Sequence, residues 1–174
     1  CVLSTTLTEI LAQAGDNDFA YADSFHFDPS EPAQFTHQLR PGWSPERLLG
    51  HCYVGDVVIA SKKLVKQAGG RKFLATLTSH DRALRLSEIA TSPTHLSALL
   101  YGSPIENRNP AADIEAVKSH CVRTRIDAHV SLCADGAAVK VIRNRTSRPT
   151  ICAIMPTRGT AAEVFGQRVV LAAH

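Results

Sequence analysis

The residues best suited to chemistry begin with two acids and an imidazole near the start of the chain. Asp23, His26 and Asp28 directly follow residues 19–22, an apolar run that predicts a short strand. Carboxylates and imidazoles at the carboxyl end of a strand in an open α/β sheet lie where ligands bind. Because hard cations prefer oxygen ligands, the cluster predicts a Mg²⁺ or Mn²⁺ site that holds a diphosphate. The alternative is a solvated loop whose aspartates stabilise turns.

A second group of candidates surrounds the only tryptophan. Trp43 precedes Ser44 and Pro45, which are typical of a helix N-cap and a first helical position. The structural interpretation of Trp43 is a hydrophobic staple beside this cap. The functional interpretation is an aromatic wall beside a ligand, near Arg40.

Ser79, His80 and Asp81 have the residue types of a catalytic triad. They are consecutive on a predicted helix, where neighbouring side chains point about 100° apart, so they cannot relay a proton among themselves. The glycine-rich phosphate-binding motifs, the Gly-x-Ser-x-Gly elbow and the His-Glu-x-x-His motif are absent from the sequence.

The predicted elements alternate between helices and strands, which indicates an α/β architecture. Apolar periodicity, caps and glycines predict helices over residues 4–14, a short one from 45, 62–68, 80–90, one from 110, and one near the C-terminus. Strands are predicted over residues 19–22, 53–54, 57–60, 95–101 and 150–155, with a loop over 24–43 that includes a short strand near Phe35. Residues 128–143 predict a hairpin that turns at Asp135-Gly136, and residues 144–149 a linker.

Composition excludes several protein classes. Of the 174 residues, 44% are apolar and 20% charged, which excludes disorder, collagen and coiled coil. A net charge of +3 does not indicate nucleic-acid binding by itself.

Seven basic and two acidic residues lie between Lys118 and Arg148, so a nucleic-acid-binding adaptor is an alternative. No aromatic residue interleaves with these charges to stack on bases, and we expect no nucleic-acid partner.

Cysteine usage and hydropathy bear on the compartment. None of the five cysteines forms a Cys-x-x-Cys pair, which favours reduced thiols in the cytosol. No apolar run approaches the ~20 residues of a membrane-spanning helix. We therefore expect a cytoplasmic protein, with peripheral attachment at the inner face of the membrane as an option.

Four segments, taken in order, resemble the family 2 glycosyltransferases of the GT-A fold, especially bacterial tandem-domain enzymes that build O-antigen and other surface polysaccharides. Residues 19–23 are similar to the strand that enters the family's metal-binding motif. Residues 40–55 are similar to its Pro-x-Trp-Ser-Pro-x-x-Leu-Leu stretch followed by Tyr-Ile-Gly, which is the most specific match. Residues 61–86 match its helix, glycine pair and Asp-x-x-Leu-Arg helix, and residues 151–159 its opening strand and nucleotide-contacting loop.

The resemblance implies a fragment of a longer polypeptide. Residues 1–105 would be the C-terminal, acceptor- and metal-binding half of one transferase domain, a GT-A-like mixed sheet with flanking helices that lacks its N-terminal nucleotide-binding half. Residues 106–149 would be a helix, a hairpin and a basic linker, and 150–174 the first strand–helix unit of a second transferase domain. The first residue, Cys1, is not an initiator methionine, which fits this interpretation. The fragment alone is expected to be inactive.

The resemblance also implies an activity. The family's inverting enzymes transfer a sugar from a nucleotide-diphospho-sugar to a glycan or lipid-linked acceptor in cell-surface polysaccharide synthesis. Mg²⁺ or Mn²⁺ offsets the charge of the leaving diphosphate, and a base deprotonates the acceptor hydroxyl. The implied residues are Asp23, His26 and Asp28 for the metal, Asp81 or His80 for the base, Trp43, Arg40 and Tyr53 for the sugar substrates, and Pro156, Thr157 and Arg158 for the nucleotide in the second domain.

Three positions depart from the family's pattern. Phe25 occupies the place of a second metal-binding acid, and Ser79 the place of the usual general base. Gly102 follows the last strand where the family usually has a histidine and an aromatic residue. These departures leave an alternative open, in which the domain is degenerate and serves as a scaffold or an acceptor-binding module.

Overall fold

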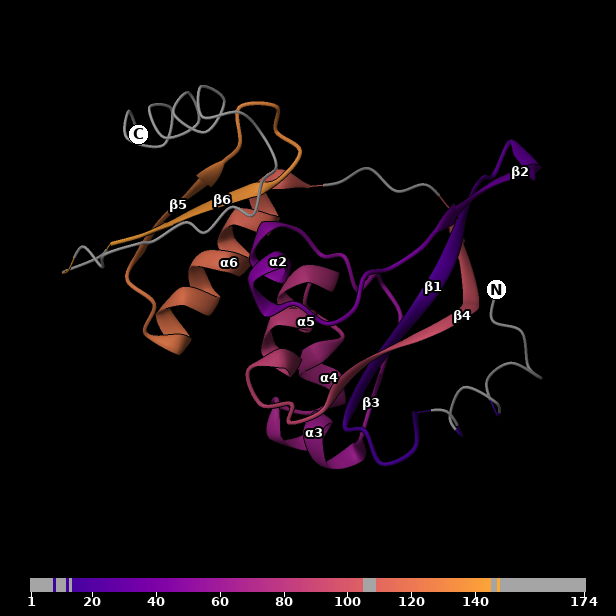
Figure 1. Ribbon diagram of the computed structural model, residues 1–174, viewed down its shortest axis with the longest axis horizontal. Helices are drawn as coiled ribbons and strands as arrows, with labels where there is room; N and C mark the ends of the chain where they lie inside the picture. Colours follow the sequence, from indigo (N-terminus) through magenta and orange to yellow (C-terminus); the bar gives the residue numbers. More distant parts are fainter. Residues whose placement is uncertain (1–7, 9–11, 13, 105–108, 145–146, 148–174) are drawn as a thin grey trace, which may run out of the picture. The chain divides into compact units, whose positions relative to one another are not determined.

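A computed structural model describes residues 8, 12, 14–104, 109–144 and 147 (Figure 1). The chain divides into two units, Cys1–Asn144 and Arg145–His174, and the first contains every described element. The elements are β1 (Phe19–Asp28), β2 (Glu31–Gln38), α2 (Pro45–Gly50), β3 (Val58–Ala60), α3 (Lys62–Gln67), α4 (Arg71–Leu74), α5 (Ser79–Ser87), β4 (Pro93–Pro104), α6 (Pro110–Thr124), β5 (Ala128–Leu132) and β6 (Val139–Arg143). The fold is mixed α/β, as predicted.

Strand β1 is the centre of a four-stranded mixed sheet. β3 pairs antiparallel with residues 19–21 of β1, and β2 pairs antiparallel with residues 24–28. β4 runs parallel to β1 along the other edge and pairs with it from Phe19 to Phe27. The β1–β4 register shifts on both sides of Asp23, so the ladder is irregular at this residue. Strands β5 and β6 form a separate hairpin sheet.

The carboxylate of Asp18 joins the start of β1 to the start of β4. It accepts hydrogen bonds from the backbone amides of Thr91 and Ser92 at 2.8 and 3.0 Å, and from their hydroxyls at 2.8 and 3.3 Å. Burial by itself raises the pKa of Asp18, but these hydrogen bonds outweigh it and lower the pKa overall. These hydrogen bonds therefore hold the chain together at the place where the parallel pairing of β1 with β4 begins.

Local capping signals predict the helix starts correctly. The Ser44 hydroxyl accepts from the amide of Arg47, with Pro45 at the first helical position of α2. Ser61 caps α3 in the same way through the amide of Leu64. Asn109 caps α6, because its side chain accepts from the amide of Ala112. Side-chain oxygens satisfy the first free amides of each helix, which is why these residue types mark helix starts.

The loop prediction for residues 24–43 is wrong for residues 24–28, whereas the short strand predicted near Phe35 is confirmed as part of the longer strand β2. β1 continues to Asp28 and turns at once into β2, because the Asp28 carboxylate accepts from the amide and the hydroxyl of Ser30 at 2.8 and 2.6 Å. Phe25 pairs with His37 and Phe27 with Phe35 across the two strands. This alternation is a strand signal that the three prolines of the segment obscured.

Three smaller predictions also need correction. Residues 53–54 form a turn, not a strand, and helix α4 was not predicted. The β5–β6 hairpin closes through residues 133–138, so its loop is longer than a two-residue turn. Gly136 still adopts a positive φ of 67°, as its turn position requires. The predicted helix over residues 4–14 lies largely outside the described residues, and the segments from residue 150 onward lie wholly outside them.

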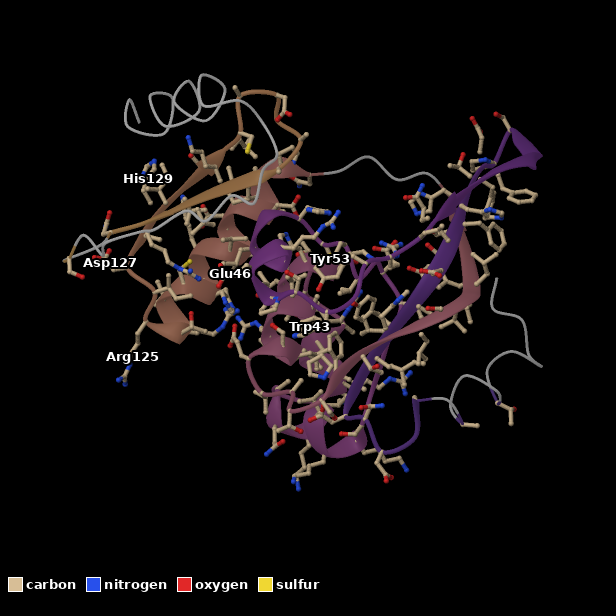
Figure 2. The ribbon with its side chains drawn as sticks, in the orientation of Figure 1. Trp43, Glu46, Tyr53, Arg125, Asp127 and His129 are labelled. Carbon is tan, nitrogen blue, oxygen red and sulfur yellow. The ribbon has the colours of Figure 1, made fainter. Side chains whose placement is uncertain are left out.

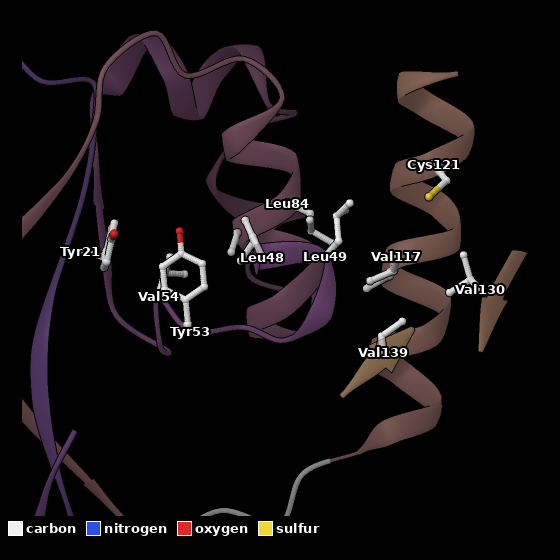
Figure 3. Packing of buried hydrophobic residues seen from close by; sticks show 12 residues of the cluster. Tyr21, Leu48, Leu49, Tyr53, Val54, Leu84, Val117, Cys121, Val130 and Val139 are labelled. Carbon is white, nitrogen blue, oxygen red and sulfur yellow. The ribbon is translucent and has the colours of Figure 1, made fainter. Parts of the chain in front are cut away.

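The largest core cluster connects the sheet to helices α2, α5 and α6 and to the β5–β6 hairpin (Figure 3). Tyr21 of β1 belongs to it together with Leu48 of α2 and Leu84 of α5, each almost completely buried. Val117 of α6 and Val139 of β6 complete it from the far side. Residues 106–149 were predicted to join two domains, and their described part, residues 109–144, contributes to the same core as β1. The domain boundaries themselves stay a prediction.

Candidate functional site

A polar cavity of about 360 Å³ lies where β1, α5, α6 and the segment after α2 converge. His26 of β1 and His51 and Asp56 after α2 contribute ionisable side chains. The N-terminal ends of α5 and α6 add further polar groups and two helix-dipole positive ends. The remaining polar lining residues are Arg40, Cys52, Thr78, Ser79, His80, Asn109 and Asp113. A cavity of this size and polarity suits a small ligand rich in hydroxyl or anionic groups.

Arg40 is the organising residue of one wall. Its backbone amide donates to Asp23 Oδ1 at 2.7 Å, its Nη1 to the Tyr53 carbonyl at 2.6 Å, and its Nη2 to Ser24 Oγ at 2.8 Å. Gly55, with φ of 82°, lies directly against this guanidinium and the Tyr101 hydroxyl, and an added Cβ would collide with both groups. Glycine is therefore required at position 55 for both the backbone conformation and the close approach.

The three residues predicted to hold a metal are not brought together. Asp23 is 7% exposed, and its Oδ1 already contacts His95 Nε2 at 2.8 Å and the Arg40 amide. His26 lies three positions after Asp23 on β1, so the two side chains are on opposite faces of the strand. Asp28 is five positions along, about 16 Å from Asp23 at a strand rise of ~3.3 Å per residue. The loop that was expected to gather these side chains is an extended strand.

These contacts do not fit a divalent cation. A Mg²⁺ or Mn²⁺ site needs several free oxygen ligands within ~2–2.6 Å of one point. The Asp23 carboxylate already contacts His95 of β4, and the Asp28 carboxylate accepts a hydrogen bond from Ser30 in the turn. Within residues 14–104 and 109–144, the structure contains no group of three or more His, Cys, Asp or Glu residues suited to a metal.

His80 is buried in the wall of the cavity with both ring nitrogens engaged. Its Nε2 lies 2.7 Å from the Leu48 carbonyl, and its Nδ1 lies 3.1 Å from Oδ1 of Asp113 on α6. A carbonyl only accepts, so Nε2 donates to Leu48, and the Asp113 carboxylate lies within hydrogen-bond distance of Nδ1. His80 is 2% exposed. The pair joins α2, α5 and α6.

Asp81 points away from the cavity, although it follows His80 directly. Its Oδ1 lies 3.2 Å from Arg85 Nε and 3.3 Å from Arg123 Nη2. Arg123 of α6 also binds Glu88 at 2.7 Å, and His120 Nδ1 contacts the same Glu88 oxygen at 2.8 Å. Asp81 thus belongs to a charge network between α5 and α6, and the two residues predicted as alternative bases have separate surroundings.

Trp43 and Tyr53 lie in an aromatic cluster (Figure 2). The Trp43 ring meets Phe19 edge-on at 5.7 Å between centroids, and Tyr53 meets Tyr21 in the same way at 5.7 Å. The Tyr53 hydroxyl accepts from the amide of Ser44 and donates to its carbonyl. Neither ring lines the polar cavity. Of the three residues predicted to bind the sugar substrates, only Arg40 lines this cavity. Pro156, Thr157 and Arg158 lie outside the described residues.

Asp56, Asp113 and Cys52 were not predicted as site residues. Asp56 and Asp113 reach the cavity through the turn before β3 and through the packing of α6, and no sequence motif marks either residue. Cys52 lines the cavity as well, but burial raises the pKa of its thiol to about 12, with Asp56 adding to the effect. The thiol therefore stays protonated and is a poor nucleophile.

Three of the five basic residues that the structure describes between Lys118 and Arg148 form ion pairs, whereas Arg125 and Lys140 form none with a described residue. Lys118 pairs with Glu115 at 2.9 Å, and Arg143 of β6 pairs with Glu46 of α2 at 2.8 Å. Arg123 belongs to the Glu88 network. Residues 145 and 148 lie outside the described residues. These pairings leave fewer free cations for a phosphate backbone than the sequence suggested, and the adaptor alternative stays an untested prediction.

Searches against protein-family models and curated proteins find no match for this chain. Within the part of the chain that the structure describes, no helix is long and apolar enough to cross a membrane. The physical arrangement of the cavity is therefore the main guide to function.

We expect the Glu88 network to make stability depend on pH. Burial raises the pKa of the Glu88 carboxyl, but hydrogen bonds from His120 and Arg123 outweigh it and hold the pKa below its ordinary 4.5. A lowered folded-state pKa gives a stabilisation that is present above the unfolded pKa and lost as the pH falls. The free energy of unfolding, measured by urea titration, is expected to drop between about pH 5 and pH 3, and more steeply in the wild type than in Glu88→Gln.

Glu115→Gln is the matched control for this experiment. Glu115 makes a single exposed ion pair with Lys118, so the variant is expected to keep the wild-type pH slope. Parallel slopes for the wild type and Glu88→Gln would show that the network does not stabilise the fold through this carboxylate.

Proposed function

We propose that residues 14–144 belong to a glycosyltransferase-type domain of the GT-A kind and that the polar cavity binds a sugar substrate. The observation that carries the proposal is the lining of the cavity. Imidazole, guanidinium, carboxylate and hydroxyl groups converge on about 360 Å³ from segments far apart in the sequence, and sugar hydroxyls and phosphates need such a mixture. Arg40 and Ser79 come from two of the segments on which the resemblance rests.

A binding experiment tests this proposal. The probes are UDP-, GDP- and dTDP-linked hexoses and neutral oligosaccharides, titrated into the ¹⁵N-labelled chain and followed by NMR. We expect saturable shifts at the amides of His26, Asp56 and Ser79 with at least one probe. His26 has no partner among the described residues and faces the cavity, so His26→Ala is expected to weaken binding about tenfold, the worth of ~1.4 kcal/mol of hydrogen bonding.

His37→Ala is the matched control for His26→Ala. Both histidines belong to the β1–β2 hairpin, but Phe25 pairs with His37 while His26 pairs with Thr36, so the two imidazoles lie on opposite faces. The control is expected to bind sugars as the wild type does. The proposal is wrong if no probe shifts the cavity amides, or if both variants weaken binding equally.

A second form of the proposal is that the domain binds a sugar without transferring it, and the contacts of two residues favour this form. Asp23, the residue that the resemblance assigns to the metal, is committed to His95 and Arg40. Ser79, in place of the usual base, accepts from Arg82 Nη2 at 3.2 Å. On this account the domain holds an acceptor glycan and needs no cation. Sugar binding is then expected to be the same in EDTA as in Mn²⁺, whereas a tenfold or larger loss in EDTA would favour a metal-dependent transferase.

A further inference from the structure

A second cavity, of about 400 Å³, lies between β3 and the three helices that follow it. Val58 of β3, Val65 of α3, Leu74 of α4 and Leu86 of α5 form its apolar walls. Two guanidinium groups, Arg71 and Arg82, line the same space. This combination of lining groups differs from that of the polar cavity, where ionisable groups of both signs dominate.

The two arginines are differently held. Arg82 Nη2 donates to the Asp56 carbonyl at 3.1 Å and to Ser79 Oγ at 3.2 Å, which fixes the plane of its guanidinium. Its Nε and Nη1 have no partner among the described residues. Arg71 is exposed in the short helix α4 and makes no ion pair with any described residue. Several guanidinium donors therefore remain available beside an apolar surface.

We propose that this second cavity binds an amphipathic anion, a phosphate or carboxylate that carries a short apolar chain. The planar donors of arginine match the oxygens of such anions, and Val58, Val65 and Leu74 would cover the chain. An inorganic anion would leave the apolar walls wet, and a neutral apolar molecule would leave the guanidinium donors unused. The two cavities share only Asp56 as a lining residue, and anion binding in the second one does not rest on the proposed function.

Asp56 limits the charge that the second cavity can hold. Asp56 lines both cavities, and its negative charge opposes the binding of an anion in either one. Removing this charge is therefore expected to strengthen anion binding between Arg71 and Arg82. Asp56→Asn becomes a gain-of-affinity variant, which a non-specific apolar site would not show.

The test uses the 174-residue chain with hexyl phosphate, inorganic phosphate and hexanol as probes, again followed by NMR. Hexyl phosphate is expected to shift the amides of Val58, Leu74 and Ala75 saturably, at least about tenfold more tightly than either other probe. Arg71→Gln is expected to weaken hexyl phosphate about tenfold, and Asp56→Asn to strengthen it. The control Lys72→Gln removes the same charge from an exposed neighbour outside the cavity and is expected to bind as the wild type does.

Several results would overturn the proposal. They are equal affinities for hexanol and hexyl phosphate, shifts confined to other parts of the chain, or equal losses in Arg71→Gln and Lys72→Gln. Co-sedimentation with vesicles that contain phosphatidic acid then distinguishes the source of the anion. Sedimentation assigns it to a lipid headgroup, and retention in the supernatant assigns it to a soluble ester.

Discussion

His80→Ala is expected to lower the free energy of unfolding by about 3–5 kcal/mol, the cost of removing one partner of a buried hydrogen-bonded pair and leaving a cavity. The imidazole is 2% exposed and links the Leu48 carbonyl to the Asp113 carboxylate. Its loss leaves a buried carbonyl and a largely buried carboxylate short of a donor, and it also leaves a cavity in the core. Urea unfolding at pH 7 measures this loss.

The matched control is His129→Ala, because His129 is exposed on β5 (Figure 2) and its removal is expected to change stability by less than about 0.5 kcal/mol. The double variant His80→Leu with Asp113→Leu replaces the pair by apolar groups and is expected to recover part of the loss, although the Leu48 carbonyl still lacks its donor. This recovery would identify the pair as a structural link between α2, α5 and α6. An unfolding free energy that is nearly unchanged in His80→Ala would show that the pair is not such a link.

The sequence predicted the helix starts correctly, because these depend on interactions between residues close together in the chain. Ser44, Ser61 and Asn109 cap their helices as expected, because a cap involves only three or four neighbouring residues. The β1–β2 hairpin was missed because its alternation of Phe25, Phe27 and Phe35 competes with three prolines in the same segment. In this edge hairpin the cross-strand packing prevails over the local turn signal.

The site was harder to predict, because its contacts join residues far apart in the sequence. Asp113 lies 33 positions from His80, and no spacing rule connects an acid in one helix to an imidazole in another. Asp81 was chosen for its motif, but its side chain points about 100° away from that of His80 and contacts Arg123. A motif therefore placed helix α5 correctly without fixing which of its side chains faces the cavity.

Asp23 is the residue at which the metal prediction and the contacts lead to different expectations. Its carboxylate is 7% exposed and holds His95 of β4 and the amide of Arg40 on the same oxygen. Asp23→Ala is therefore expected to cost about 2–4 kcal/mol of unfolding free energy, since two part-buried donors lose a charged acceptor. Asp23→Asn keeps a neutral oxygen for the Arg40 amide and is expected to lose about half as much. Urea unfolding of both variants measures the difference.

The effect of Mn²⁺ on thermal unfolding separates the two roles of Asp23. A ligand that binds only the folded state raises Tm, by an amount that grows with the logarithm of its concentration relative to Kd. If Asp23 is structural, Mn²⁺ at millimolar concentration is expected to leave Tm unchanged in the wild type and in Asp23→Asn alike. Asp28→Ala is the matched control, because the exposed Asp28 carboxylate serves only the turn at Ser30. A Tm increase with Mn²⁺ that disappears in Asp23→Asn would assign Asp23 to a metal, and it would require Arg40 to move.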